Sequence, residues 1–158
     1  MPDPFHGVRV FQGADPVVAQ PVATSVIGML MSVDPADIPA GYAVNVPFAM
    51  RQPTDAANMP DALKQELDTV WDNFGGQVIV VLVDQGADAG EKATNATGDA
   101  TTMTGVHAFK KAGGLGLEVP QLLCMPGVAN ATTGSADAVV AEAIVVANAS
   151  RAQLDADG

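Results

Sequence analysis

The feature that most constrains the fold is an amphipathic helix followed at once by a strand that is apolar throughout. In "MPDALKQELDTVWDNFGG" (59–76), apolar side chains recur at spacings of three and four, as on the buried stripe of a helix: Leu63, Leu67, Val70, Trp71 and Phe74. Asp61 is predicted to cap the start, and Gly75 and Gly76 to end the helix. The next segment, "QVIVVLV" (Gln77 to Val83), is β-branched and continuously apolar, which is typical of a strand covered on both faces. Together they predict a parallel sheet packed between helices.

Two segments before this helix are predicted strands. "SVIGMLMSV" (Ser25 to Val33) is short, apolar nearly throughout and ended by the turn-forming "DPADIPAG", so we expect a first buried strand there. "AVNVPFAM" (43–50) contains Pro47, which lacks an amide donor and would confine this strand to an edge or a strand end.

Three further elements are predicted after residue 104. "TGVHAFKKAGGLG" gives a short helix with Val106 and Phe109 facing inward and with Gly113 and Gly114 ending it. "PQLLCMPG" (120–127) is predicted to be another buried strand. A last helix is predicted from a cap at Ser135, and it is apolar on more than one face.

The segment from Asp84 to Gly105 has almost no large apolar side chain and many Gly, Asp and Thr residues. We therefore expect an exposed, mobile loop without apolar anchors. Its acidity argues against phosphate binding.

The predicted fold class is α/β: a small layered domain with a mostly parallel buried sheet flanked by helices, preceded by an extended N-terminal β arm. With 158 residues the chain is long enough for one ordinary core. We expect residues 1–22 to form the arm and its linker, and residues 23–158 to form the α/β domain.

Charge and apolar-run length narrow the classes of partner. The net charge of −11 makes nucleic acid a poor partner, and the longest apolar runs are far shorter than the roughly 20 residues of a membrane span. The first residues lack a basic start leading into an apolar block, so export by a signal peptide is not expected. The single cysteine, Cys124, is predicted to be a small buried hydrophobe.

No pattern in the sequence predicts a catalytic, cofactor or metal site. "GGLG" (113–116) follows a helix, whereas a phosphate loop follows a strand and opens a helix. His6 and His107 lack a second ligand at metal-binding spacing. The loop from Pro126 to Ser135 lies where open α/β sheets bind ligands, but it contains no lysine or arginine. An enzyme is therefore not expected; a small α/β enzyme or ligand-binding domain using this 126–135 loop is the alternative.

The segment "FHGVRVFQ" (Phe5 to Gln12) has the period-two alternation of a strand but no partner at hairpin distance. Val8 and Val10 share one face, and Arg9 and Phe11 share the other. Pro16 and Pro21 then hold the connector extended. Such an arm suits addition to the sheet of another subunit, and pairing within its own chain or fraying is the alternative.

Several strings, in the same order along the chain, resemble the contractile tail sheath proteins of myophages and R-type pyocins. The strings are "FHGVRV" (5–10), "ATSVIGMLMSV" (23–33), "NVPFAM" (45–50), "VIVVLVDQG" (78–86), "TGVHAF" (104–109), "PQLLCMPG" (120–127) and the closing "SRAQLDADG" (150–158). The resemblance covers only the N-terminal portion of sheath subunits, which continue into further domains, including an inner one that touches the tail tube.

The resemblance implies a structural subunit that assembles helically around a tail tube and contracts to drive the tube through a cell envelope. The implied partners are further copies of itself in stacked rings, the tail tube protein, and baseplate and tail terminator proteins. The implied location is the virion tail, assembled in the bacterial host cytoplasm. The arm residues Phe5, Val8, Arg9, Val10 and Phe11 would stitch neighbouring subunits together.

Overall fold

A computed structural model of the chain describes residues 26–128 and 140–149. Its centre is a four-stranded sheet in the order β2-β3-β1-β4, made of β1 (Ile27–Val33), β2 (Phe48–Met50), β3 (Val78–Asp84) and β4 (Leu122–Cys124). β3 and β4 both pair in parallel with β1, and β2 pairs antiparallel with β3 at one edge. The predicted α/β class with a mostly parallel sheet is confirmed.

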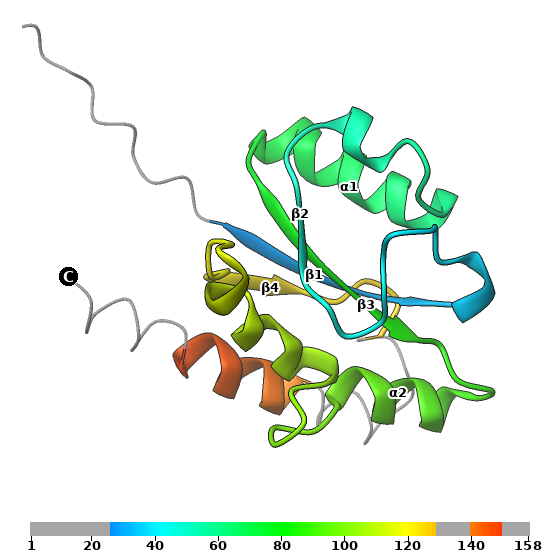
Figure 1. Cartoon of the computed structure of the whole chain (residues 1–158), viewed down its shortest axis with the longest axis vertical. Helices are drawn as coiled ribbons and strands as arrows, with labels where there is room; N and C mark the ends of the chain where they lie inside the picture. Colours follow the sequence, from blue (N-terminus) through cyan, green and yellow to red (C-terminus); the bar gives the residue numbers. More distant parts are fainter. Residues whose placement is uncertain (1–25, 129–139, 150–158) are drawn as a thin grey trace, which may run out of the picture.

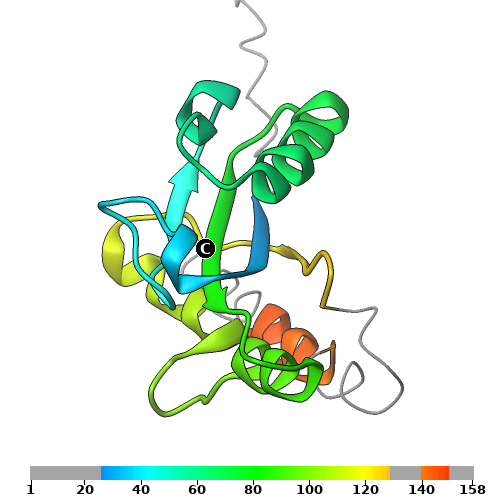
Figure 2. The ribbon, with the colours of Figure 1, turned by 90° about the vertical axis from the view of Figure 1, so that its right-hand side faces the viewer.

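Helices cover both faces of the sheet (Figures 1 and 2). On one face lie α1 (Asp61–Phe74) and the short 3-10 turns η1 (Pro35–Asp37) and η2 (Pro53–Ala56). On the other lie α2 (Ala89–Thr97), the 3-10 helix η3 (Gly105–Lys111), the 3-10 turn η4 (Gly113–Leu115) and a helix at 140–149. The result is a three-layer arrangement, with the sheet in the middle.

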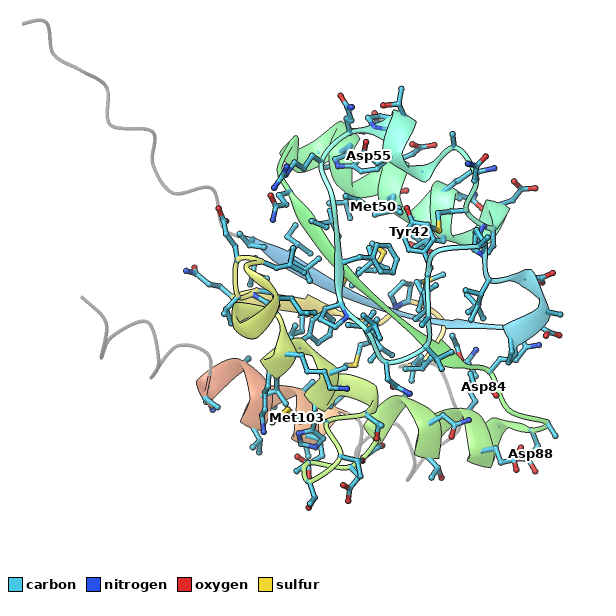
Figure 3. The ribbon with its side chains drawn as sticks, in the orientation of Figure 1. Tyr42, Met50, Asp55, Asp84, Asp88 and Met103 are labelled. Atoms are coloured by element: carbon cyan, nitrogen blue, oxygen red, sulfur yellow. The ribbon has the colours of Figure 1, made fainter. Side chains whose placement is uncertain are left out.

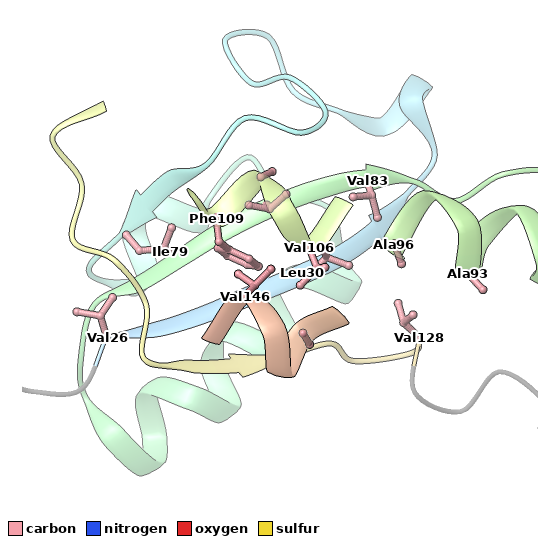
Figure 4. Packing of buried hydrophobic residues seen from close by; sticks show 13 residues of the cluster. Val26, Leu30, Ile79, Val83, Ala93, Ala96, Val106, Phe109, Val128 and Val146 are labelled. Carbon is pink, nitrogen blue, oxygen red and sulfur yellow. The ribbon is translucent and has the colours of Figure 1, made fainter. Parts of the chain in front are cut away.

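The two faces of the central strands contribute side chains to two separate apolar clusters. Met29, Met31, Val78, Val80 and Leu82 point to the α1 face, where Leu63 and Leu67 are fully buried. On the opposite face, Figure 4 shows the packing of Val26, Leu30, Ile79, Val83, Ala93, Ala96, Val106, Phe109, Val128 and Val146. The continuously apolar β3 therefore has both of its faces covered, as its sequence predicts.

The predicted strands and helix around 25–83 are confirmed, with one local correction. Gly75 ends α1 in a left-handed conformation (φ 61°), and the Trp71 indole packs against the α1-side cluster. Asp61 is not the cap: Pro60 occupies that position, and Asp61 is the first helical residue, 3.1 Å from the Lys64 ammonium. Proline is well suited to the beginning of a helix, since the first amides have no partner within the helix.

The predicted loop from Asp84 to Gly105 is wrong, because α2 lies within it. The Asp88 carboxylate caps the helix by accepting hydrogen bonds from the amides of Gly90 and Glu91, and Ala93 and Ala96 are buried against the sheet. Because alanine is small, the buried face of α2 lacks the large apolar side chains on which the prediction depended.

Two predictions after residue 104 are also corrected. β4 is an edge strand and not a buried one, and the Leu122 side chain is 53% exposed. Gly113 and Gly114 lie inside η4, and Gly116 is the residue that adopts the left-handed conformation (φ 70°). Val106 and Phe109 are fully buried, as predicted.

Gly28 in β1 allows the sheet and η3 to come close together. A β-carbon at Gly28 would lie 2.5 Å from Leu123 Cδ2 and 3.0 Å from Phe109 Cε1. A side chain at Gly28 would therefore force Leu123 and the segment before β4 away from β1 and would crowd the Phe109 ring.

Candidate functional site

In an open α/β sheet, ligands bind beyond the carboxyl ends of the parallel strands, where successive connections leave on opposite faces. Here the connection from β1 to β3 passes through α1, and that from β3 to β4 passes through α2 on the other face. β3 lies on one side of β1 and β4 lies on the other, so the strand order reverses next to β1. The corresponding position is therefore between the carboxyl ends of β1 and β4.

The carboxylates at the ends of β1 and β3 have structural partners. Asp34 accepts hydrogen bonds from the Ala36 amide (2.9 Å) and from Gln85 Nε2 (3.3 Å). Asp84, labelled in Figure 3 at the end of β3, accepts one from the Gly86 amide at 2.8 Å. These hydrogen bonds hold the turns that follow β1 and β3.

Lys92 lies beside the 126–135 loop, a position that the sequence did not predict. The Lys92 ammonium, on α2, is 3.8 Å from the position that a β-carbon of Gly127 would occupy. The prediction missed this proximity because it had no helix at 89–97. Residues 129–135 of that loop, with the predicted cap Ser135, lie outside the described residues.

A polar pocket of about 340 Å³ lies at the carboxyl end of β3, lined by Asn45, Val83, Asp84, Thr94, Asn95, Gly98, Asp99 and Thr104. Its polar groups largely bind one another or the neighbouring backbone. Asn95 Nδ2 donates to the Asp84 carbonyl at 3.1 Å, and Asn45 Oδ1 accepts from the Gly105 amide at 2.7 Å. Hydrogen bonds from the Thr102 amide and hydroxyl lower the pKa of Asp99. The Asp99 carboxylate is therefore charged and holds the turn that follows it by these hydrogen bonds.

His107 is buried and pairs with a carboxylate that is distant in sequence. Its Nε2 lies 3.5 Å from Glu142 Oε2 on the helix at 140–149, while its buried Nδ1 has no hydrogen-bond partner in the structure. The pair connects η3 to that helix. No group of three or more His, Cys, Asp or Glu side chains that could hold a metal ion occurs within 26–128 and 140–149.

Cys124 is unsuited to nucleophilic chemistry. Burial, with a smaller contribution from the negative charge of Glu66, raises the pKa of the Cys124 thiol to about 11. The thiol is therefore protonated near neutral pH, whereas the thiolate is the nucleophile. Its contact with the α1-side cluster agrees with the prediction of a small apolar residue, although it is only partly buried.

The most distinctive surface of the described chain is apolar, and it lies at the free edge of β4. A groove of about 390 Å³ runs between β4 and the helix at 140–149, lined by Gln121, Leu122, Leu123, Met125, Val140, Ala143, Ile144 and Ala147. Leu122 and Ile144 are more than half exposed, at 53% and 54%. Within the described ranges β4 pairs with β1 alone, so its outer edge has no strand partner there. We call this edge and its groove the β4 edge site.

An unpaired strand edge beside exposed apolar side chains is the arrangement that accepts an added strand. One sequence feature indicated this exposed apolar surface: the predicted last helix has apolar side chains on more than one face. In the structure, Ala143 and Val146 of this helix are buried, whereas Val140, Ile144 and Val145 are exposed.

The predicted intersubunit residues Phe5, Val8, Arg9, Val10 and Phe11 lie outside the described residues, as does the proposed division at residue 22. No helix in the described part of the chain is long and apolar enough to cross a membrane.

No protein-family model matches the chain, and no curated protein matches it significantly.

Proposed function

We propose that the protein is a structural subunit of a contractile tail sheath, built into the virion tail from many copies of itself around a tail tube. The tube, baseplate and tail terminator proteins are its further partners, and its assembly takes place in the bacterial host cytoplasm. In this mechanism no covalent bond changes: subunits move as nearly rigid bodies and extended linkers absorb the displacement.

The observation on which the proposal most depends is the ordered set of sequence strings that resemble sheath proteins, from "FHGVRV" to "SRAQLDADG". The β4 edge site adds support, because a subunit that joins its neighbours by strand addition needs an accepting edge. The structural hydrogen bonds of Asp34, Asp84 and Asp99 also favour a structural role over a catalytic one.

Immuno-electron microscopy tests the proposal. Antibodies raised against the purified 158-residue chain are applied to particles from the lysate that contains the gene. We expect labels at many positions along contractile tails, in both extended and contracted forms. Unlabelled tails, with the protein recovered only as a monomer or a small closed oligomer, would overturn the proposal.

The second candidate is a small α/β enzyme or ligand-binding domain using the 126–135 loop. The position of the Lys92 ammonium beside Gly127 favours this candidate, because a cation near the carboxyl end of β4 suits an anionic ligand. Titration with nucleotides and inorganic phosphate, followed by thermal melting, separates the two functions. A saturable rise in melting temperature that Lys92→Ala abolishes supports the ligand-binding domain, and an unchanged melting temperature counts against it.

A further inference from the structure

The central strand β1 extends beyond its neighbour β4. It pairs with β3 along its whole length, from Ile27 to Val33, whereas its pairing with β4 ends at Met29. Within the described residues, the segment 30–33 therefore has no strand partner on the β4 side. This unpaired end of β1 lies at the carboxyl edge of the sheet, where open α/β sheets bind ligands.

Pro126 explains why the pairing with β4 stops. The Leu122 amide donates to the Val26 carbonyl at 3.5 Å, so every second residue of β4 directs its amide toward β1. Counting on from Leu122, this series reaches position 126, where proline has no amide hydrogen to donate. Residues 126–128 then form a turn in which Gly127 is left-handed (φ 71°).

Ser32 presents two hydrogen-bonding groups at the unpaired end of β1. The Ile27 amide donates to the Gln77 carbonyl, and the Val33 carbonyl accepts from the residue after β3, so the odd-numbered residues of β1 face β3. The Ser32 amide therefore faces the other side, beyond the end of β4. The Ser32 hydroxyl is buried and has no hydrogen-bond partner in the structure. A buried polar group without a partner is costly, and a ligand that accepts hydrogen bonds would satisfy it.

Packing brings α2 and the turn after β4 to the same face of the sheet. Ser32 follows Leu30 by two residues, so both side chains point to one face. On that face Leu30 packs in one cluster with Ala93 of α2 and with Val128 (Figure 4). The residues that precede Ala93 and Val128 in the chain are therefore near the carboxyl end of β1.

Lys92 supplies an unpaired positive charge there. Its ammonium lies 3.8 Å from the position that a β-carbon of Gly127 would occupy. Among residues 26–128 and 140–149 this ammonium has no hydrogen-bond or ion-pair partner, although the whole chain has a net charge of −11. Lys92 is half-buried and Gly127 is exposed, so solutes can reach the ammonium from solvent.

The carboxylate nearest in sequence is held on the opposite side of β1. Asp34 follows Ser32 by two residues, and it accepts hydrogen bonds from the Ala36 amide and from Nε2 of Gln85, the residue after β3. These contacts keep the Asp34 carboxylate toward β3, whereas the unpaired end faces away from β3. An anion beside Ser32 is therefore not directly opposed by Asp34.

We propose that Ser32, Lys92 and Gly127 form a site, the β1 end site, that binds the phosphate group of a small molecule. The Lys92 ammonium neutralises the phosphate, and the Ser32 amide and hydroxyl donate hydrogen bonds to its oxygens. The absence of a side chain at Gly127 leaves the ammonium accessible. The inference deepens the second candidate function, on which it rests for a ligand at this edge of the sheet, and it is independent of the sheath proposal.

Titration of inorganic phosphate into the full 158-residue chain, labelled with ¹⁵N and kept at constant ionic strength, tests the site. We expect saturable shifts of the Ser32 and Gly127 amide resonances, because the first amide donates to the phosphate and the second borders it. Sodium chloride at the same ionic strength is the blank, since a general salt effect would produce the same shifts there.

Lys92→Ala and Ser32→Ala should each weaken phosphate binding by about tenfold or more, the usual effect of losing a charged hydrogen bond. Lys110→Ala is the matched control: Lys110 is an exposed lysine on η3, and its variant should bind as the parent does. Without phosphate, Ser32→Ala should melt no lower than the parent, because the lost hydroxyl has no partner. A loss of binding is then distinct from a loss of folding.

Absence of saturable shifts, unchanged affinity in Ser32→Ala, or equal weakening by Lys110→Ala would each overturn the proposal. Acetate that binds as tightly as phosphate would overturn the choice of a phosphate group. A rise in melting temperature with nucleotides that persists in Ser32→Ala would leave the ligand-binding candidate standing and remove only the β1 end site. Labelling of tails in the immuno-electron microscopy is independent of all these results.

Discussion

Individual residues set how closely the layers of this domain approach, and Gly28 is the clearest case. Its lack of a side chain brings the Phe109 ring and Leu123 against β1. The close approach explains why a glycine occurs inside an otherwise apolar central strand, where it would normally weaken pairing.

Gly28→Ala should lower the free energy of unfolding by about 1–3 kcal/mol, the usual cost of overpacking a filled core. The added methyl group would meet Leu123, Pro120 and the fully buried Phe109 ring. Chemical denaturation measures the loss. Gly76→Ala is the matched control, since nothing lies within 4 Å of the added carbon, and a similar loss in both variants would contradict the packing argument.

The Cys124 thiol predicts a pH dependence whose sign follows from its raised pKa. The pKa is about 11 in the folded chain against an ordinary 9.0, so the unfolded thiol ionises first as the pH rises. The thiol's contribution to stability is present below pH 9 and is lost between about pH 9 and 11. Melting temperatures should therefore fall less steeply over this range in Cys124→Ala than in the parent chain; parallel curves would refute the assignment.

At the scale of elements, α1 and the helix at 140–149 differ in what their apolar side chains do. Those at the centre of α1 fill a closed cluster beneath the sheet, and several of the last helix remain at the surface beside β4. Substitutions in the two helices should therefore affect different properties.

Leu67→Ala should destabilise the domain by about 2–5 kcal/mol, because it removes a fully buried side chain and leaves a cavity. Asp68→Ala, on the exposed side of the same helix, should change stability by no more than about 0.5 kcal/mol. Denaturant titration of both variants checks the orientation of α1, and an unchanged midpoint for Leu67→Ala would contradict it.

Ile144→Lys should leave the fold intact, because the side chain is 54% exposed, yet prevent docking in the groove of the β4 edge site. The expected readout is an unchanged melting temperature together with a shift of the sedimentation profile toward monomer. Ala141→Lys, at another exposed position of the helix and outside the groove lining, is the control. Association of Ile144→Lys equal to that of the parent chain would show that the groove is not used.

The sequence predicts elements well where side chains of large apolar volume repeat with a clear period. That holds for β1, α1 and β3, whose buried residues include Leu30, Leu67 and Leu82. The same prediction fails for α2, because this helix buries only the small side chains of Ala93 and Ala96 and so has little apolar volume per turn. Helix formation there depends on the Asp88 cap and on the available surface of the sheet.

Features of the candidate site depend on strand order, which local sequence does not determine. "QLLC" is apolar enough for a central strand, but β4 lies at the edge because β3 occupies the other side of β1. The proximity of His107 to Glu142, and of Lys92 to Gly127, likewise arises only when the last helix and α2 pack on one face. No spacing in the sequence indicates these pairs.

At the scale of the whole molecule, the proposed role of the arm separates folding from assembly. The described core is continuous from β2 to β4 without residues 1–25. The stability of the domain should therefore come from residues 26–158, and the arm should act between molecules.

Removal of Met1 to Gln12 should leave circular dichroism and melting temperature close to those of the parent chain while association is lost. Sedimentation velocity over a range of concentrations measures the second effect. If the truncated chain fails to fold, the arm is an intramolecular strand; if it associates as the parent does, the arm does not join subunits. Either result would contradict the assigned role.

The parallel pairing of β1 with β3 also bears on how the chain is made. Ile27 pairs with Val78, so about 50 residues of chain must be synthesised between the two halves of the central ladder. At about 5–20 residues per second, the apolar β1 waits several seconds on the ribosome before its partner emerges. During that interval "IGMLMSV" is an unpaired β-prone segment, which makes it an aggregation hazard until β3 has been synthesised.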